Sequence, residues 1–293
     1  MRRTYREKIY KCGDYIDVQV FPVFAHGNTR RKKRAKPTSE MQSRLNQRNA
    51  ERALIRLLNA NFTEDDISVT LTFSEEHLPD SYEEAERRMK NFLRRVKRLR
   101  AKLGLSEIKY IIIPGSGRYH FHIPMNGGID DKTLASLWPY GYCNTIHFQF
   151  NESGLEGHAR YVARQFEEDQ YGGRDLLSML DIDEETGEVS EMQNAECKMK
   201  RKKGKRRYSC SKNIVRPETE ERDGRISAQR VEDMATVDSA SRAVFEKLYP
   251  GYCFSSCVPY YNQENGGYYL EIRMYREDAA FIKSRGKFKR IRS

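Results

Sequence analysis

The chain has 293 residues, of which 38% are hydrophobic and 32% charged, which is enough for one large domain or two modest ones with a densely ionic surface. Lys and Arg number 53 against 42 Asp and Glu, giving a formal net charge of +11 that attracts polyanions, nucleic acid first among them. No apolar run of 18 residues exists and no apolar segment follows the basic N-terminus, so neither a transmembrane helix nor a signal peptide is predicted. We therefore expect a cytoplasmic protein with no membrane partner.

Hydrophobic periodicity, capping residues and turn signals divide the chain into strands and helices. In chain order, the predicted elements are a strand at 15–24, a helix at 38–60, a strand at 67–73, a helix at 81–103, strands at 109–114 and 119–125, a helix at 130–137, a strand at 142–150, a helix at 154–168, a helix near 239–248 and a strand near 268–275. A Gly-Ser-Gly turn joins 109–114 to 119–125 and predicts an antiparallel hairpin. This order predicts an α+β fold, a central antiparallel sheet with helices packed on it, and not a doubly wound parallel sheet.

Changes in composition suggest four regions. They are an N-terminal strand and basic connector at 1–37, a compact core at 38–175, a charged flexible segment at 176–215, and a small C-terminal α/β extension of unknown role at 216–293. Six scattered cysteines are typical of reduced cytoplasmic thiols. Cys253 and Cys257 have the spacing of a metal-binding pair, but no second pair lies at zinc-finger spacing, so a zinc site there is a minor alternative.

The sharpest chemical feature is His120-Phe121-His122 in the predicted strand at 119–125. Residues two apart in a strand point to the same face, so both imidazoles project together, opposite Phe121. Two neutral imidazoles make half of a divalent metal site. The alternative is a pair of surface histidines, and the pattern alone does not choose between them.

A second feature is Tyr161 in the predicted helix HARYVARQF. Tyr161 and Arg164 lie three residues apart and share a helix face. A phenol ionises only near pH 10, so it needs help to act as a nucleophile at neutral pH. A nearby guanidinium and a metal-bound phosphate would provide that help. The alternative is a tyrosine packed at the edge of an amphipathic helix.

Several basic and polar side chains are candidate contacts to a nucleic-acid backbone. Four arginines recur every four residues along the helix at 38–60 and predict a basic face: Arg44, Arg48, Arg52 and Arg56. Such charges bind phosphates by counterion release without reading sequence. Thr72, in the strand at 67–73, and Arg118, just before His120, are further candidates. The basic run at 198–207 is either a second patch or a solvated linker.

Taken in order, three motifs resemble those of HUH endonucleases, the rolling-circle replication initiators. They are Leu71-Thr72-Phe73, His120-Phe121-His122 and Tyr161-Val162-Ala163-Arg164. Over residues 40–217 the sequence is similar to the replication-associated Rep proteins of bacterial plasmids, phages and integrated elements, of the single-tyrosine type. The resemblance implies an RRM-like palm, with the HUH core at 38–175.

The resemblance also implies an activity. This is metal-dependent, site-specific nicking and joining of single-stranded DNA through a 5′-phosphotyrosine, which initiates rolling-circle replication. His120 and His122 would hold Mn²⁺ or Mg²⁺, Tyr161 would attack phosphorus, and Arg164 would orient the phenolate or the phosphate. The partners implied are the single-stranded replication origin and, since no Walker-type loop is present, a host helicase and polymerase.

The sequence departs from the family pattern at two points. Arg164 stands where the family has lysine, and the strand before the histidine pair lacks the acidic residue that often completes the metal site. Glu107, His147 and Gln149 are the candidates for a third ligand by position and chemistry. A non-catalytic nucleic-acid-binding protein that retains the fold is therefore the main alternative. A cupin-like oxygenase is a minor one, because the long helices interrupt any all-β barrel.

Overall fold

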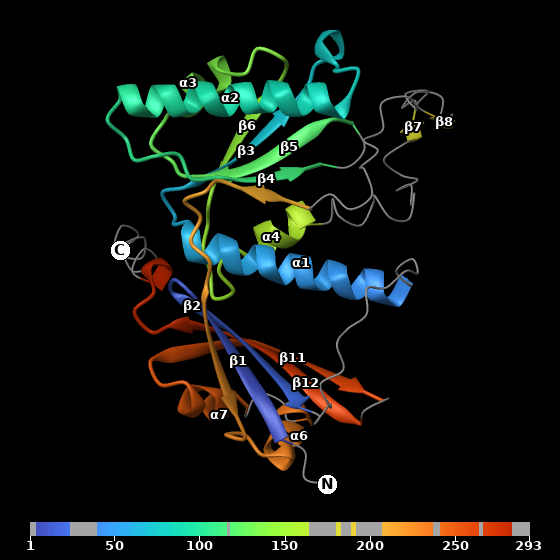
Figure 1. Cartoon of the computed structure of the whole chain (residues 1–293), viewed down its shortest axis with the longest axis vertical. Coiled ribbons are helices and arrows are strands. Elements are labelled where there is room, and N and C mark those ends of the chain that lie inside the picture. The colour runs from blue at the N-terminus through green and yellow to red at the C-terminus, as the bar shows by residue number, and fades with distance from the viewer. Residues whose placement is uncertain are drawn as a thin grey trace, which may run out of the picture. The chain divides into compact units, whose positions relative to one another are not determined.

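The computed structural model describes residues 4–23, 40–115, 118–163, 180–182, 189–191, 207–236, 241–263 and 266–282. Contacts divide the chain into two compact units, each with a five-stranded antiparallel sheet (Figure 1). The first unit comprises Met1–Thr63, Gln149–Gly157 and Val215–Ser293, and the second comprises Glu64–Phe148 and His158–Ile214. Helices pack on these sheets, so the predicted α+β class is confirmed. In the described part of the chain, no helix is long and apolar enough to cross a membrane.

The first unit has the strand order β10-β1-β2-β12-β11. Its strands are β1 (Thr4–Cys12), β2 (Tyr15–Val23), β10 (Glu218–Asp223), β11 (Tyr252–Asn262) and β12 (Gly267–Arg276), and its helices are α1 (Glu40–Asn61), α6 (Ala228–Thr236) and α7 (Ser241–Leu248). Apolar residues of β1, β2 and β12 form a core with α6 and α7, whereas α1 packs on β1 and β2. The β1–β2 turn uses Gly13 at φ +64°, where a Cβ would approach the Asn59 carbonyl oxygen to 2.8 Å.

The second unit has the strand order β6-β3-β5-β4-β9. Its strands are β3 (Ile67–Thr72), β4 (Ile111–Pro114), β5 (His120–Met125), β6 (Cys143–His147) and β9 (Ser209–Cys210), and its helices are the 3-10 turn η1 (Glu75–His77), α2 (Tyr82–Lys102), α3 (Asp131–Ser136) and α4 (Glu156–Ala163), of which His158 onward belongs to this unit. A separate small pair joins β7 (Leu180–Ile182) to β8 (Val189–Glu191). The predicted hairpin of β4 and β5 is confirmed by their antiparallel pairing.

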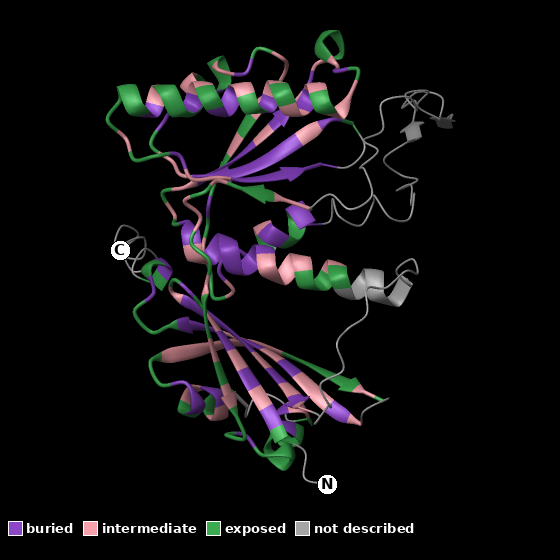
Figure 2. Ribbon diagram, viewed as in Figure 1, coloured by how far each residue is buried: buried purple, intermediate pink, exposed green. Residues whose placement is uncertain are grey.

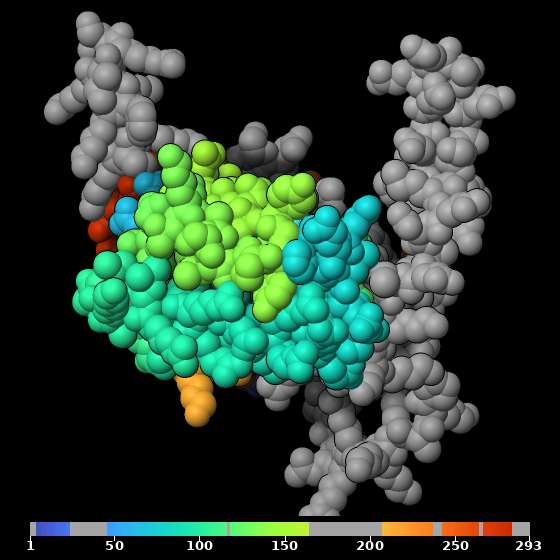
Figure 3. All heavy atoms as spheres, turned by 90° about the horizontal axis from the view of Figure 1, so that it is seen from above, coloured from blue at the N-terminus to red at the C-terminus, as the bar shows by residue number. Residues whose placement is uncertain are grey.

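Helix α2 fixes which face of this sheet becomes the core. The Ser81 side chain accepts a hydrogen bond from the Glu84 backbone N–H and begins the helix. Its apolar stripe is buried against alternate residues of β3 and β5, with Leu71 and Phe121 among them. In Figure 3, α2 and the segment around α3 and β6 form one continuous outer surface of this unit. Thr70, His120, His122 and the other intervening residues therefore point to the opposite face.

The two units divide the chain differently from the sequence-based boundaries. Helix α1 was placed in the core at 38–175, and residues 216–293 in a separate extension. In the structure α1 packs on β1 and β2, while β10 pairs with β1 and β12 pairs with β2. These pairings join segments more than two hundred residues apart, and a hydrophobic pattern does not specify which strands become neighbours. Strand β1 was also missed, because charged residues occupy one of its faces and hide its alternation.

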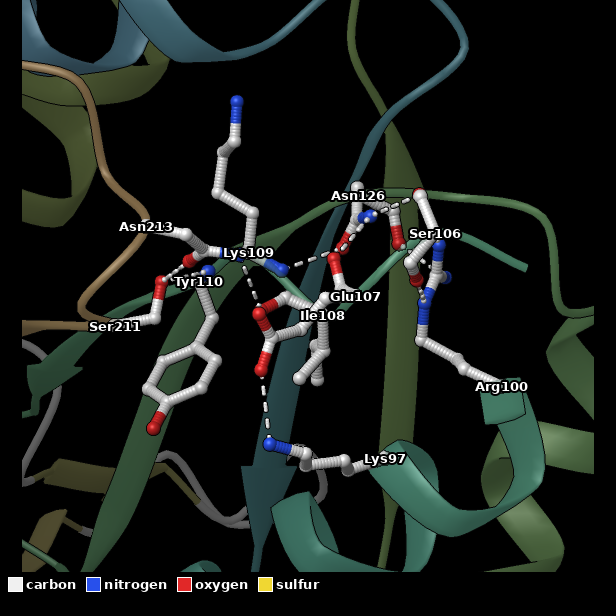
Figure 4. Close-up of polar contacts among 10 residues, drawn as sticks. All are labelled: Lys97, Arg100, Ser106, Glu107, Ile108, Lys109, Tyr110, Asn126, Ser211 and Asn213. Carbon is white, nitrogen blue, oxygen red and sulfur yellow. Dashed lines mark hydrogen bonds and ion pairs between the residues drawn. The ribbon is translucent and has the colours of Figure 1, made fainter. Parts of the chain in front are cut away.

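The end of the predicted flexible segment is bound to the second unit (Figure 4). The Ser211 hydroxyl accepts a hydrogen bond from the Tyr110 backbone N–H at 3.0 Å, and the Asn213 side chain donates to the Ile108 carbonyl at 3.1 Å. Residues 207–214 thus extend the sheet as β9 beside β4. Most of the remaining segment, 176–206, lies outside the described residues.

A buried guanidinium closes the far end of the same sheet (Figure 4). Arg100 of α2 donates hydrogen bonds to three carbonyl oxygens, those of Ser106, Asn126 and Gly127, at 2.9, 3.1 and 2.6 Å. The Asn126 side chain accepts from the Lys109 backbone N–H at 2.8 Å. One side chain therefore joins the end of α2 to the loops on either side of β4 and β5.

Replacing Arg100 by methionine is expected to destabilise the chain by about 2–4 kcal/mol, because buried carbonyls lose charged donors. Urea denaturation measures the loss. The matched control is Arg98→Met on the exposed side of the same helix, where we expect a change within about 0.5 kcal/mol. Equal effects of the two substitutions would contradict the role assigned to Arg100.

Candidate functional site

The two histidines of β5 lie side by side on the face opposite α2. In the register of the sheet, His122 faces Thr70 of β3 and Ile113 of β4, and His120 faces Thr72. The two imidazole ring centroids are 5.0 Å apart with the ring planes nearly perpendicular. The shared orientation expected from their spacing is thus present in the structure.

Hydrogen bonds fix the atoms that these rings can offer to a ligand. His120 Nδ1 lies 2.8 Å from the Arg118 carbonyl oxygen, which only accepts, so Nδ1 carries the proton and Nε2 keeps its lone pair. His122 Nδ1 lies 3.1 Å from the Thr70 hydroxyl. His122 Nε2 is buried and has no hydrogen-bond partner. A buried nitrogen without a partner is costly, and a metal ion that accepts its lone pair would account for it.

Burial keeps His122 neutral. Its residue is only 4% exposed, and burial lowers the pKa of its imidazole to about 3, with smaller contributions from His120 and His158. Burial also lowers the pKa of His158, on α4, to about 4. At neutral pH the lone pairs of both imidazoles are therefore free of protons, as metal ligation or proton acceptance requires.

A missing side chain holds His120 in place. The Gly115 backbone N–H donates to the His120 carbonyl at 2.9 Å, so the two residues are adjacent across β4 and β5. A Cβ on Gly115 would lie 2.0 Å from His120 Nε2, closer than atoms can approach. Only glycine at 115 leaves room for the imidazole in this position.

Tyr161 lies beside the histidine pair. It is on α4, and its ring centroid is 5.9 Å from that of His122, with the planes at 76°. The Tyr161 side chain is at the surface, since the residue is 54% exposed. A phenol open to a ligand therefore adjoins a neutral, buried imidazole within one unit. Arg164 lies outside the described residues.

His158 is the site residue that the sequence reasoning missed. It lies three residues before Tyr161 and so on the same side of α4. Its Nε2, like that of His122, is buried with no hydrogen-bond partner, and its ring packs edge-on against Phe148 with centroids 5.2 Å apart. The signal was available, since a histidine one helical turn before the tyrosine had to share its face.

Thr72 and Arg118 border the histidine pair. Thr72 faces His120 across the sheet, and its hydroxyl donates to the Tyr142 carbonyl at 3.3 Å. Arg118 is exposed and donates to the Phe73 carbonyl at 2.9 Å. Their proposed contact with DNA stays a prediction, and their positions next to His120 are compatible with it.

The arginines of α1 do not form one open basic face. Arg56 is 9% exposed, bound to Asp17 at 2.5 Å, with its guanidinium carbon 3.5 Å above the Tyr10 ring. Arg52 pairs with Glu271, whereas Arg48 is exposed, and the side chain of Arg44 is not described. The reason is geometric: each step of four residues turns about 40° around an α-helix, so three steps move from solvent to the core.

None of the expected third ligands stands beside the pair. Glu107 binds Lys97 at 2.9 Å near Asn126, at the opposite end of β5 from His120. His147 faces Ile67, whose side chain is in the α2 core, and so points away from the histidines. Gln149 belongs to the first unit.

A ready-made metal centre is likewise absent from the described residues, where no group of three or more His, Cys, Asp and Glu side chains is placed to share an ion. The minor zinc alternative is also weakened. Burial raises the pKa of Cys257 to about 12, so that thiol stays protonated and is a poor metal ligand. His120 and His122 thus remain the best candidates for holding an ion, as two nitrogens of an incomplete set.

Comparison with known families supports this site. The profile of a family described as Replication-associated protein ORF2 matches residues 66–170. This range includes β3, both histidines of β5 and Tyr161, and leaves out most of the first unit. No curated protein and no solved structure matched the chain. The family match supports a replication initiator of the Rep type, with DNA as its partner.

Substituting alanine for Gly115 is expected to push the His120 ring out of position and to raise the Mn²⁺ concentration needed for binding by about ten-fold. Paramagnetic broadening of the imidazole proton signals measures binding without any reaction. Gly157→Ala is the matched control, because a Cβ there meets nothing within 4 Å. Unchanged Mn²⁺ binding in Gly115→Ala would contradict the steric role of Gly115.

Acid is expected to destabilise the fold through His122. Its pKa rises from about 3 in the folded chain to 6.5 on unfolding, so below pH 6.5 the unfolded state takes up a proton that the folded state refuses. Stability therefore falls as pH falls, by about 2 kcal/mol at pH 5 for this residue. Urea denaturation at pH 7 and pH 5 should show a smaller loss for His122→Gln than for the exposed control His147→Gln. Identical losses would show that His122 does not titrate in this way.

Proposed function

We propose that this chain initiates rolling-circle replication by nicking and rejoining single-stranded DNA at a specific site, through a 5′-phosphotyrosine. The observation that carries the proposal is the 5.9 Å separation between the rings of Tyr161 and His122 inside the region matched to a Rep-type family. This arrangement joins a nucleophile to a candidate metal site.

His120 and His122 would hold the ion through their Nε2 atoms, which carry lone pairs at neutral pH. A divalent ion there would polarise the scissile phosphate as a Lewis acid. Two imidazole nitrogens without a carboxylate favour Mn²⁺ over Mg²⁺. The Arg118 carbonyl and the Thr70 hydroxyl orient the two rings through their Nδ1 atoms.

Tyr161 supplies the nucleophile. Its phenol loses a proton, and the oxygen forms a bond to phosphorus as the bond to the 3′ oxygen breaks. The departing 3′ oxygen takes up a proton, which leaves a 5′-phosphotyrosine and a free 3′-hydroxyl. Attack by a 3′-hydroxyl on the phosphotyrosine reverses the step and joins the ends, so the bond energy is retained without a nucleotide cofactor. Arg164, one turn beyond Tyr161 in the sequence, would stabilise the charge on the phosphate.

The products determine the partners that the function requires. The 3′-hydroxyl can prime a polymerase, and the displaced strand must be unwound by a helicase. The sequence has no GxxxxGK[ST] loop for ATP hydrolysis, so both activities are assigned to host proteins.

The test is an adduct assay on a denaturing gel, with labelled single-stranded oligonucleotides that tile the DNA around the gene, in Mn²⁺ and in EDTA. We expect a Mn²⁺-dependent adduct that resists detergent and falls more than about a thousand-fold in Tyr161→Phe. Tyr142→Phe is the matched control, because this tyrosine is exposed in the same unit and the substitution likewise removes only a hydroxyl.

Two outcomes would contradict the proposal. An undiminished adduct in Tyr161→Phe would place the nucleophile elsewhere, with Tyr171 the next candidate. No adduct with any oligonucleotide, together with DNA binding that EDTA does not change, would favour the non-catalytic nucleic-acid-binding protein.

A further inference from the structure

The sheet of the first unit has one face that is not fully covered by helices. Ile272 and Met274 of β12 are buried in the core with α6 and α7. Alternate residues point to opposite faces, so Tyr269 and Glu271 lie on the other side. The ion pair between Glu271 and Arg52 shows that this other side is the one on which α1 lies.

A row of aromatic rings crosses this α1 side. Tyr260 of β11 faces Tyr269 of β12, with ring centroids 6.2 Å apart, and directly opposite residues of antiparallel strands share a face. Glu271 faces Gln19 of β2, and the same register two residues further places Phe21 next to Tyr269. Phe21, Tyr269 and Tyr260 thus lie in line across three neighbouring strands and are named here the aromatic row.

The open end of the aromatic row is at the surface. Tyr260 is 58% exposed, and the whole stretch Val258–Tyr261 is exposed on the outermost strand, the part of β11 coloured green in Figure 2. Exposed aromatic and apolar side chains in one place indicate a binding surface. Addition of another strand along this edge is disfavoured by Pro259, which has no N–H to donate. The rings themselves are therefore the feature that a partner would recognise.

A positive charge stands level with the aromatic row. Along α1, Arg56 and Arg52 bind carboxylates at successive two-residue steps of the sheet, Asp17 and Glu271. Four helical residues rise about 6 Å and two strand residues about 6.8 Å, so helix and strand advance together. One turn earlier on α1, the exposed Arg48 therefore comes level with the next step, which is the aromatic row.

We propose that the aromatic row and Arg48 bind single-stranded DNA, with bases stacked on the rings and a phosphate near the guanidinium. Aromatic rings on an open sheet surface stack unpaired bases whatever their sequence, and each stacked base typically strengthens binding about five-fold or more. A duplex keeps its bases stacked on one another and gains little there. The surface lies outside residues 66–170 and would hold DNA beyond the nick site; the choice of DNA as the strand rests on the proposed function.

The test is fluorescence anisotropy with a labelled oligothymidylate, using the full chain carrying Tyr161→Phe in EDTA so that no covalent step contributes. We expect Tyr260→Ala to raise the Kd about ten-fold and Tyr260→Phe to restore it to within about two-fold. The matched control is Tyr261→Ala: this adjacent tyrosine is 48% exposed but faces Tyr268, on the α6 and α7 side. Arg48→Gln should lower the dependence of log Kd on log salt by about 0.7.

Unchanged binding in Tyr260→Ala, or an equal loss in Tyr261→Ala, would overturn the proposal. Tighter binding of oligouridylate with the same dependence on Tyr260 would overturn the choice of DNA. The adduct assay separates this proposal from the proposed function. An adduct that forms while Tyr260→Ala binds normally contradicts only the aromatic row, and Tyr260-dependent binding with no adduct contradicts only the nicking mechanism.

Discussion

The alternation of side chains along β5 is the constraint on which the candidate site depends. Phe121 and Ile123 fill the core beneath α2, so His120 and His122 must share the opposite face. Pairing with β3 on one side and β4 on the other fixes the register, and a slip of one residue would bury both imidazoles in the core and expose the apolar residues. The packing that stabilises the second unit is therefore the same packing that orients its chemistry.

Burial gives this site its chemical character. His122 is closed off from water and stays neutral, while the neighbouring Tyr161 is at the surface. A ligand can thus reach the phenol next to an imidazole whose Nε2 lacks any protein partner. His158 adds a second neutral imidazole on the same side of α4 as Tyr161. The Rep-type family match covers all of these residues, and the remaining part of the chain forms its own sheet with its own surface.

Local features were predictable from the sequence, and long-range ones were not. The boundaries of α2 followed from the Ser81 cap and a regular apolar stripe, and the orientation of the histidines followed from a period of two. The pairing of β12 with β2 had no local signal, so the C-terminal residues were assigned to a separate extension. The regular spacing of the α1 arginines was misleading, because a four-residue interval drifts around the helix and carries Arg56 to Asp17. His158 was overlooked because attention went to strand positions for the third ligand, although its spacing from Tyr161 was visible.

The central claim is that Tyr161 is the residue that becomes joined to DNA. Peptide mapping by mass spectrometry tests it directly: the adduct is digested with nuclease and trypsin, and the peptide that carries the nucleotide is sequenced. Cleavage after Arg160 and Arg164 releases Tyr-Val-Ala-Arg, and the account predicts a nucleotide phosphate on the tyrosine of this tetrapeptide. A nucleotide on the next tryptic peptide, which contains Tyr171, or on any other residue would contradict it.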